Sequence, residues 1–156
     1  MARWGELERA QPEMAALLRS LLGWIPIAYL ATVRRGGSPR VHPVCPVLAG
    51  EGMCVAVAGS SAPQPSPKRF DLAHDGRYAL HALPGKRDDE FYVTGRARLV
   101  EDAAERQLIV ETAKHHIRGD DWVFELGIDY AMTAYWEHVG QPGTYPVRTY
   151  WRPPVA

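Results

Sequence analysis

The sequence predicts one mainly β domain, an antiparallel barrel with flanking helices. Short apolar segments rich in β-branched and aromatic residues recur along the chain, and clusters of Gly, Pro, Asp and Ser separate them. Helical patterns lie between only some of these segments, whereas a doubly wound sheet needs a helix after nearly every strand. A chain of 156 residues, 46% hydrophobic and 23% charged, suits one buried core. We expect a single domain over 1–156, with 1–24 as an N-terminal helical segment.

The first element is expected to be an amphipathic helix over 5–23. Its apolar residues recur at intervals of three, four and seven positions with charged residues between them, which is typical of a helix with one buried face. Pro12 lies inside this segment. It is expected to break the helix, because proline lacks the backbone donor and clashes with the preceding turn.

Three apolar runs follow, and we expect them to form an antiparallel meander. Turn-forming residues separate the runs, as in strands joined by short connections. Pro43 and Pro46 lie in the second run and cannot donate to a strand ladder. This strand is therefore expected to be an edge strand, a bulged strand, or one whose backbone leaves room for another partner. The predicted strands span 27–33, 41–48 and 53–58.

The rest of the chain begins with a polar loop over 59–67, and ordered loops of this length often have a function. Asp102 is expected to cap a later helix, because its side chain can accept from the free amides of a first turn. The elements predicted after the loop are a short helix over 68–75, strands over 77–83 and 91–101, a helix from 102 to about 116, and strands over 122–128, 130–138 and 147–151.

Charge and targeting patterns argue against several classes of protein. The 18 Lys and Arg residues balance 18 Asp and Glu residues, so the chain lacks the positive field with which proteins attract nucleic-acid backbones. Fifteen of the 18 cations are Arg, which suits local recognition of small anions. The sequence has no signal-peptide pattern and no apolar run long enough to span a membrane. We expect a cytoplasmic protein with neither a nucleic-acid nor a membrane partner.

Motifs of several familiar enzyme classes are absent from the sequence. It has no GxGxxG, no P-loop, no HExxH and no GxSxG motif. The two cysteines, Cys45 and Cys54, lack the spacing of a zinc site and are too few for a disulfide framework. The His and Asp pairs at 115–116 and 120–121 are expected to lie around a helix end, where adjacent side chains point in different directions. No metal site is predicted.

The strongest candidate site lies over 59–69. The hydroxyls of Ser60, Ser61 and Ser66 precede two cations, Lys68 and Arg69, at the start of a predicted helix. Hydroxyls, amides and cations together suit a phosphate monoester, because each gives a donor or a positive charge to a dianion. The alternative is a solvated surface loop in which Ser66 caps the helix.

Six segments have an order and spacing that resemble a known family, the pyridoxamine 5′-phosphate oxidase-like FMN-binding split barrels, which include flavin and deazaflavin oxidoreductases. The segments are AYLATV (28–33), GSPRVHPV (37–44), SPKRFDL (66–72), DGRYALH (75–81), FYVTGRARLV (91–100) and VRTYWR (147–152). The resemblance implies a six-stranded antiparallel split β-barrel, Greek-key-like, that forms a homodimer. It also implies FMN, or alternatively the deazaflavin coenzyme F-420, in each of two grooves between the subunits.

The resemblance further implies which residues bind the cofactor. The strand from 40 to 45 would run beside the isoalloxazine ring, and the Ser-rich loop would hold the phosphate. Many members carry an Arg two positions after the motif lysine, where this chain has Phe70, and Arg69 lies one position early. The implied cofactor-binding residues are Arg40, His42, Pro43 and Val44 near the ring, and Ser60, Ser61, Ser66, Lys68 and Arg69 near the phosphate.

The function implied by the resemblance is that of a flavin-dependent oxidoreductase, which transfers hydride through flavin N5 to a small organic substrate. The alternatives are a deazaflavin-dependent reductase and a non-catalytic module that binds a flavin or a haem. Vitamin B6 oxidation is not favoured, because the Arg-rich C-terminal ending of those oxidases is missing. Candidates for substrate contact are Tyr135, Trp136 and Trp151, each of which could instead pack in the core.

Overall fold

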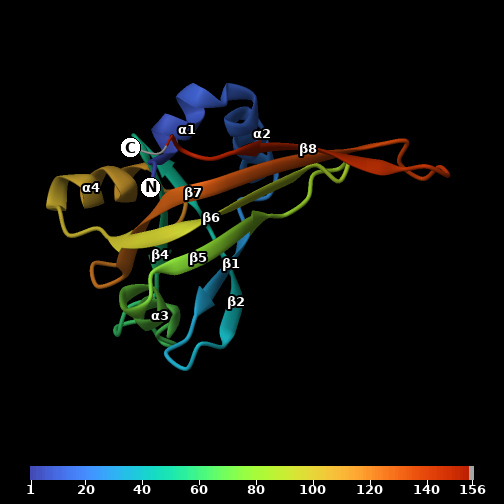
Figure 1. The fold of residues 1–156 in the computed structure, drawn as a ribbon. Helices are drawn as coiled ribbons and strands as arrows, with labels where there is room; N and C mark the ends of the chain where they lie inside the picture. Colours follow the sequence, from blue (N-terminus) through green and yellow to red (C-terminus); the bar gives the residue numbers. More distant parts are fainter. Residues whose placement is uncertain (155–156) are drawn as a thin grey trace.

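The computed structural model describes residues 1–154, which form one antiparallel sheet with four helices around it (Figure 1). The helices are α1 (Trp4–Ala10), α2 (Pro12–Trp24), α3 (Lys68–His74) and α4 (Ala103–Thr112). The strands are β1 (Ala28–Val33), β2 (Pro39–Val44), β3 (Val47–Ala49), β4 (Gly52–Val57), β5 (Arg77–Ala82), β6 (Glu90–Leu99), β7 (Trp122–Glu137) and β8 (Tyr145–Trp151). Within the described residues, no helix is long and apolar enough to cross a membrane.

The strands follow the order β2-β1-β5-β6-β7-β4-β3, and β8 pairs with β7. Neighbouring strands are antiparallel throughout. The protein is therefore mainly β, with an open sheet that is consistent with a split barrel. Its eight strands exceed the six that the resemblance implies, because the three-residue β3 and the strand β8, which lies off the main path, join the other six.

Proline residues set the boundaries of two elements, one between helices and one between strands. The N-terminal segment breaks as predicted, since α1 ends at Ala10 and Pro12 opens α2, at a position where a backbone donor is not needed. The single strand predicted over 41–48 is wrong. Pro46 cannot donate to a ladder, and the chain leaves the sheet after Val44 and returns at Val47. β2 and β3 consequently lie at opposite ends of the strand order, joined by Cys45 and Pro46.

Two later predictions also need correction. The strands predicted over 122–128 and 130–138 are one continuous strand, β7, which absorbs the interruption at Asp129 as a register shift opposite Thr94 and Gly95. The helix predicted to reach about residue 116 ends at Thr112. Its cap is as predicted, because the Asp102 carboxylate accepts the Glu105 amide at 2.7 Å.

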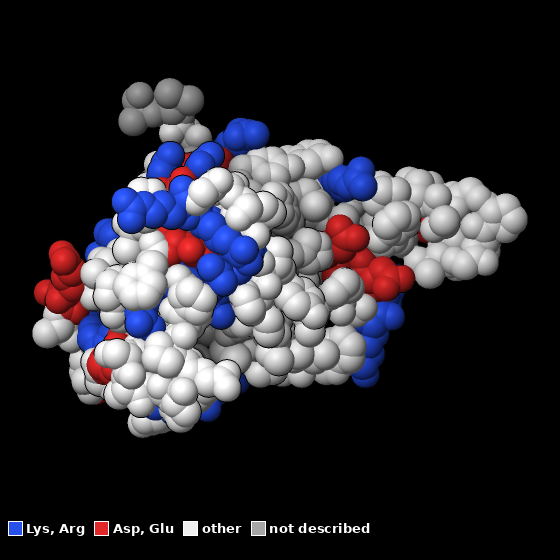
Figure 2. All heavy atoms as spheres, turned by 90° about the horizontal axis from the view of Figure 1, so that it is seen from below, with Lys and Arg blue, Asp and Glu red and all other residues white. Residues whose placement is uncertain are grey.

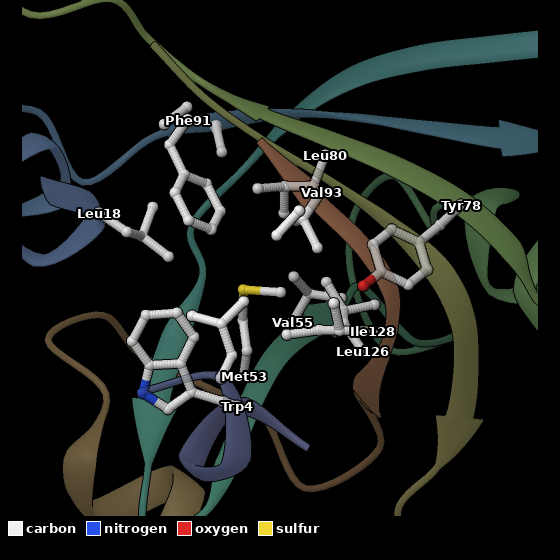
Figure 3. Packing of buried hydrophobic residues seen from close by; sticks show 14 of the residues in the cluster. Trp4, Leu18, Met53, Val55, Tyr78, Leu80, Phe91, Val93, Leu126 and Ile128 are labelled. Carbon is white, nitrogen blue, oxygen red and sulfur yellow. The ribbon is translucent and has the colours of Figure 1, made fainter. Parts of the chain in front are cut away.

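The main core lies between the sheet and the two N-terminal helices (Figure 3). Trp4 of α1 and Leu18 of α2 are fully buried, and Trp4 meets Phe91 of β6 edge-on with ring centroids 6.5 Å apart. Burial of one such side chain stabilises a fold by about 1.5–3 kcal/mol. The Tyr78 hydroxyl donates to the Gly127 carbonyl at 3.1 Å, so this buried polar group is satisfied.

The end of β7 and the start of β8, with the turn that joins them, form an arm that projects from the body of the molecule (Figure 1). The pairing runs from Ala131 with Trp151 to Glu137 with Tyr145. Trp151 is buried in the core and anchors the base of the arm, whereas Tyr135 and Tyr145 farther along it are exposed. The arm thus presents aromatic side chains away from the core.

Candidate functional site

The candidate site begins on β2, where alternate residues share one face of the sheet. Arg40, His42 and Val44 pair in register with the buried residues Thr32, Leu30 and Ala28 of β1, so all three lie on the inner face. Val44 is buried and belongs to the main core. Its neighbour Pro43 is exposed on the outer face. The four residues predicted beside the ring are therefore divided between the two faces.

Arg40 is held in place by Asp71 of α3. The Arg40 Nε donates to Asp71 Oδ2 at 2.7 Å, and the Thr32 hydroxyl donates to the same oxygen at 2.9 Å. The carboxylate is almost fully buried. This contact fixes α3 beneath the β1–β2 hairpin and fixes the direction of the Arg40 guanidinium, since both partners lose their freedom to rotate.

Positive charges converge around the imidazole of His42. The pKa of His42 lies below its usual value because desolvation, and then the charges of Lys68, Arg40 and Arg34, disfavour its protonated form. The pKa of Lys68 is also lowered, by burial and by the charge of Arg40. We call Arg34, Arg40, His42 and Lys68 the cationic group. Asp71 is the carboxylate that opposes these charges at His42.

The cationic group belongs to the end of the molecule that holds α3 and the β1–β2 hairpin. Seen from below, toward this end, Lys and Arg side chains lie on the body of the molecule, whereas the projecting arm is largely uncharged (Figure 2). The sequence as a whole has no net charge, so positive charge at the site comes from local placement. A surface of this kind attracts small anions.

The Ser-rich loop binds a carboxylate of the same chain. The Ser61 amide donates to Asp120 Oδ2 at 2.7 Å, the Ser61 hydroxyl donates to Asp120 Oδ1, and the Ser60 hydroxyl lies 3.4 Å from Oδ2. The residues predicted to hold one phosphate are thus in two places. Lys68 joins Arg40 and His42, whereas Ser60 and Ser61 contact Asp120.

Arg69 and Ser66 close the base of the loop. The Arg69 guanidinium is buried and donates to the Ala58 carbonyl at 2.9 Å and to the Ser66 carbonyl at 3.4 Å, while the Ser66 amide donates to Ala58 at 3.1 Å. Phe70 is 56% exposed. Its ring lies 4.5 Å from the Arg69 guanidinium carbon and covers it. In this arrangement Arg69 stabilises the loop through backbone contacts.

The outer face of the sheet carries a row of aromatic side chains. Tyr92 meets His81 on one side and Tyr130 on the other, with ring centroids 6.2 Å apart in both pairs. Tyr130 stacks on Tyr150 at 6.1 Å. Tyr29 and Tyr150, at the two ends, are about half exposed. We call this set the outer aromatic row; its members, one each from β1, β5, β6, β7 and β8, are Tyr29, His81, Tyr92, Tyr130 and Tyr150.

The three candidates for substrate contact have different environments. Tyr135 is exposed on the arm, and Trp136 is half-buried next to it. Trp151 packs in the main core, which is the alternative to substrate contact that the sequence left open for it. Of the three, Tyr135 is the most accessible to a ligand.

Sequence reasoning missed the two carboxylates that organise the site. Asp71 lies within the segment SPKRFDL, but nothing local indicates that it pairs with Arg40, 31 positions earlier. The sequence predicts Asp120 only as part of a helix end, and the residue it contacts, Ser61, lies 59 positions earlier in the chain. Either pairing could be predicted only if the order of the strands in the sheet were known beforehand.

Comparison with known proteins supports the fold through similarity to solved structures. No protein-family profile matches the chain, and no curated protein matches its sequence. A haem-binding protein from Mycobacterium smegmatis superposes with a TM-score of 0.61 at 20% identity, over 89% of this chain. This chain spans 58% of the length of that protein.

Two shorter structures align over nearly their whole length. A NimC/NimA family protein from Clostridium acetobutylicum has a TM-score of 0.62 at 14% identity, covering 91% of this chain and 98% of its own. A protein from the same organism, related to general stress protein 26 and described as of the pyridoxinephosphate oxidase family, has a TM-score of 0.62 at 10% identity, covering 90% and 94%. The chain therefore has the fold of the pyridoxamine 5′-phosphate oxidase-like split barrels. At these identities the likeness concerns the fold alone.

Proposed function

We propose that the protein is a flavin-dependent oxidoreductase, which binds FMN between two copies of the chain and transfers hydride through flavin N5 to a small organic substrate. The observation that supports this proposal is the cationic group on the β1–β2 turn, β2 and α3, next to the edge of the sheet. In residues 1–154, β2 ends the strand order. Backbone groups on its far edge can therefore hydrogen-bond a planar ring.

The residues of the cationic group fit the phosphate of FMN. Guanidinium and ammonium groups are the usual partners of a phosphate dianion. Lys68 and Arg34 supply charge, and Arg40 supplies donors whose direction Asp71 fixes. The pKa of His42 is lowered by desolvation and by the charges around it, and a neutral imidazole can donate through one ring nitrogen and accept through the other. A bound flavin supplies the hydride chemistry, while the chain positions and shields the ring.

A second copy of the chain is proposed to complete the groove. Tyr29 and Val41 on the outer face are 48% and 57% exposed, and Tyr150 at the far end of the outer aromatic row is 56% exposed. Aromatic side chains are enriched in protein interfaces, and a contiguous row of exposed apolar side chains marks an interaction surface more often than single ones do. A homodimer would cover this face and place the arm of one copy near the site of the other.

Binding of FMN tests the proposal directly. Purified protein should quench flavin fluorescence at micromolar FMN and sediment as a dimer. Lys68→Ala should weaken FMN binding by about 10-fold or more, because a hydrogen bond to a charged group contributes about 1.5–3 kcal/mol. Lys114→Ala, an exposed lysine at the end of α4, is the matched control and should bind FMN normally. Absence of FMN binding, or equal binding by both variants, would contradict the proposal.

Two alternatives share the same site. A deazaflavin would replace FMN in the same titration and would then be the tighter ligand. A haem-binding role is favoured by His42, an exposed imidazole with a lowered pKa beside cations that could pair with propionates. Haem titration tests that role, because His42→Ala should then remove the haem absorbance shift, whereas Lys114→Ala should keep it.

A further inference from the structure

The Ser-rich loop is an anion-binding arrangement whose anion comes from the chain itself. The Asp120 carboxylate receives the Ser61 amide at 2.7 Å, the Ser61 hydroxyl, and the more distant Ser60 hydroxyl. These donors lower the pKa of Asp120, with the Ser61 hydroxyl as the largest cause. The donors therefore favour a negative charge at this point, as a phosphate-binding loop would.

Hydrogen bonds from Arg106 and to Asp121 hold the turn that carries Asp120 in place. Arg106 of α4 donates to the carbonyls of Asp121 at 2.9 Å, Arg118 at 2.9 Å and Gly119 at 3.1 Å. The buried Asp121 carboxylate accepts the Gly59 amide at 2.9 Å and the Arg118 amide at 2.9 Å. These contacts hold the turn without using the Asp120 side chain.

The loop and the turn are also in close backbone contact. A Cβ atom at Gly59 would overlap the backbone of Asp120, so only glycine allows this approach. The Asp120 side chain itself is exposed. Replacing that side chain should consequently free the Ser60 and Ser61 donors while the turn and the loop keep their positions.

We propose that Asp120 is a resident anion that determines which ligands the Ser60–Ser61 loop accepts: while ionised, it excludes phosphate and similar oxyanions from the loop, and its removal opens an oxyanion site there. For the natural ligand this inference rests on the proposed function. It implies that the phosphate of the cofactor contacts the cationic group and that Asp120 keeps it away from the loop. Asp120 is accordingly a specificity-determining residue.

Titration of inorganic phosphate, followed by the amide NMR signal of Ser61, tests the proposal. In Asp120→Ala the Ser61 signal should shift with phosphate, with an affinity about tenfold or more above that of the unchanged protein. Asp120→Asn, which keeps the side-chain volume and one acceptor, should give an intermediate response and serves if the alanine variant does not fold. Glu13→Ala removes one exposed carboxylate from the first turn of α2 and should behave like the unchanged protein.

The outcomes separate this inference from the proposed function. If FMN binds to no variant but phosphate still shifts Ser61 in Asp120→Ala, the proposed function fails and the role of Asp120 stands. Equal phosphate responses in the unchanged protein and Asp120→Ala overturn the inference, as does no response in Asp120→Ala and Asp120→Asn. Adding Ser61→Ala to Asp120→Ala should abolish the gain in phosphate affinity, measured by calorimetry; a retained gain would place the phosphate elsewhere and also overturn it.

Discussion

Replacing Asp71 by alanine should destabilise the fold, because two donors converge on its carboxylate. The Asp71 side chain is 8% exposed, and the Arg40 side chain that donates to it at 2.7 Å is 18% exposed. Removing one partner of a buried ion pair costs about 3–5 kcal/mol. Some water reaches Arg40 and screens its charge, so we expect Asp71→Ala to lower the free energy of unfolding by about 2–4 kcal/mol.

Urea denaturation measures this loss. Two further variants separate the contribution of the ion pair with Arg40 from that of the hydrogen bond with the Thr32 hydroxyl. Thr32→Val removes the second donor, at 2.9 Å, and should cost about 1 kcal/mol. Arg40→Met combined with Asp71→Ala leaves no unpaired charge, so the double variant should lose less than the sum of the two single losses. A loss below about 0.5 kcal/mol for Asp71→Ala, the size of an ordinary surface substitution, would refute the reasoning, as would strict additivity.

Four other perturbations give distinct results. Glu125→Gln should lower the free energy of unfolding by about 1.5–3 kcal/mol, since two arginines donate to this buried carboxylate; an unchanged urea midpoint would contradict this. Cys45 should react with a thiol reagent before Cys54, because burial, and then the charge of Glu125, raises the pKa of Cys54 to about 12. The unfolded thiol loses its proton near 9.0, so stability should fall as pH rises from there toward 12, less so in Cys54→Ala. Tyr150→Lys should shift the proposed dimer to monomers in sedimentation, whereas Leu108→Lys, similarly exposed on α4, should not.

Local chemistry was enough to predict many element boundaries. Pro12 and the cap at Asp102 act through the residues within a turn of them, and both predictions are confirmed. The prediction of one strand over 41–48 was wrong, because a run of apolar residues does not reveal at which of its two prolines the chain leaves the sheet. Pro43 remains within β2, while Pro46 separates β2 from β3.

The site was less predictable, because its contacts join distant parts of the chain. Lys68 and Arg69 are neighbours in sequence, but successive residues of a helix point about 100° apart. Arg69 therefore turns back to the Ala58 carbonyl, whereas Lys68 remains near Arg40. The pairing of Ser61 with Asp120 depends on the order of the strands, which no nearby residue encodes.

The short link between β2 and β3 determines how far the sheet must curl. These strands end a seven-strand order, and in a flat sheet with a spacing of about 4.8 Å their axes would lie roughly 29 Å apart. Three backbone steps join Val44 to Val47, and a chain of that length reaches about 11 Å at most. The two ends of the sheet must therefore approach one another. Cys45 and Pro46 act as a tether whose length sets the width of the opening in the barrel.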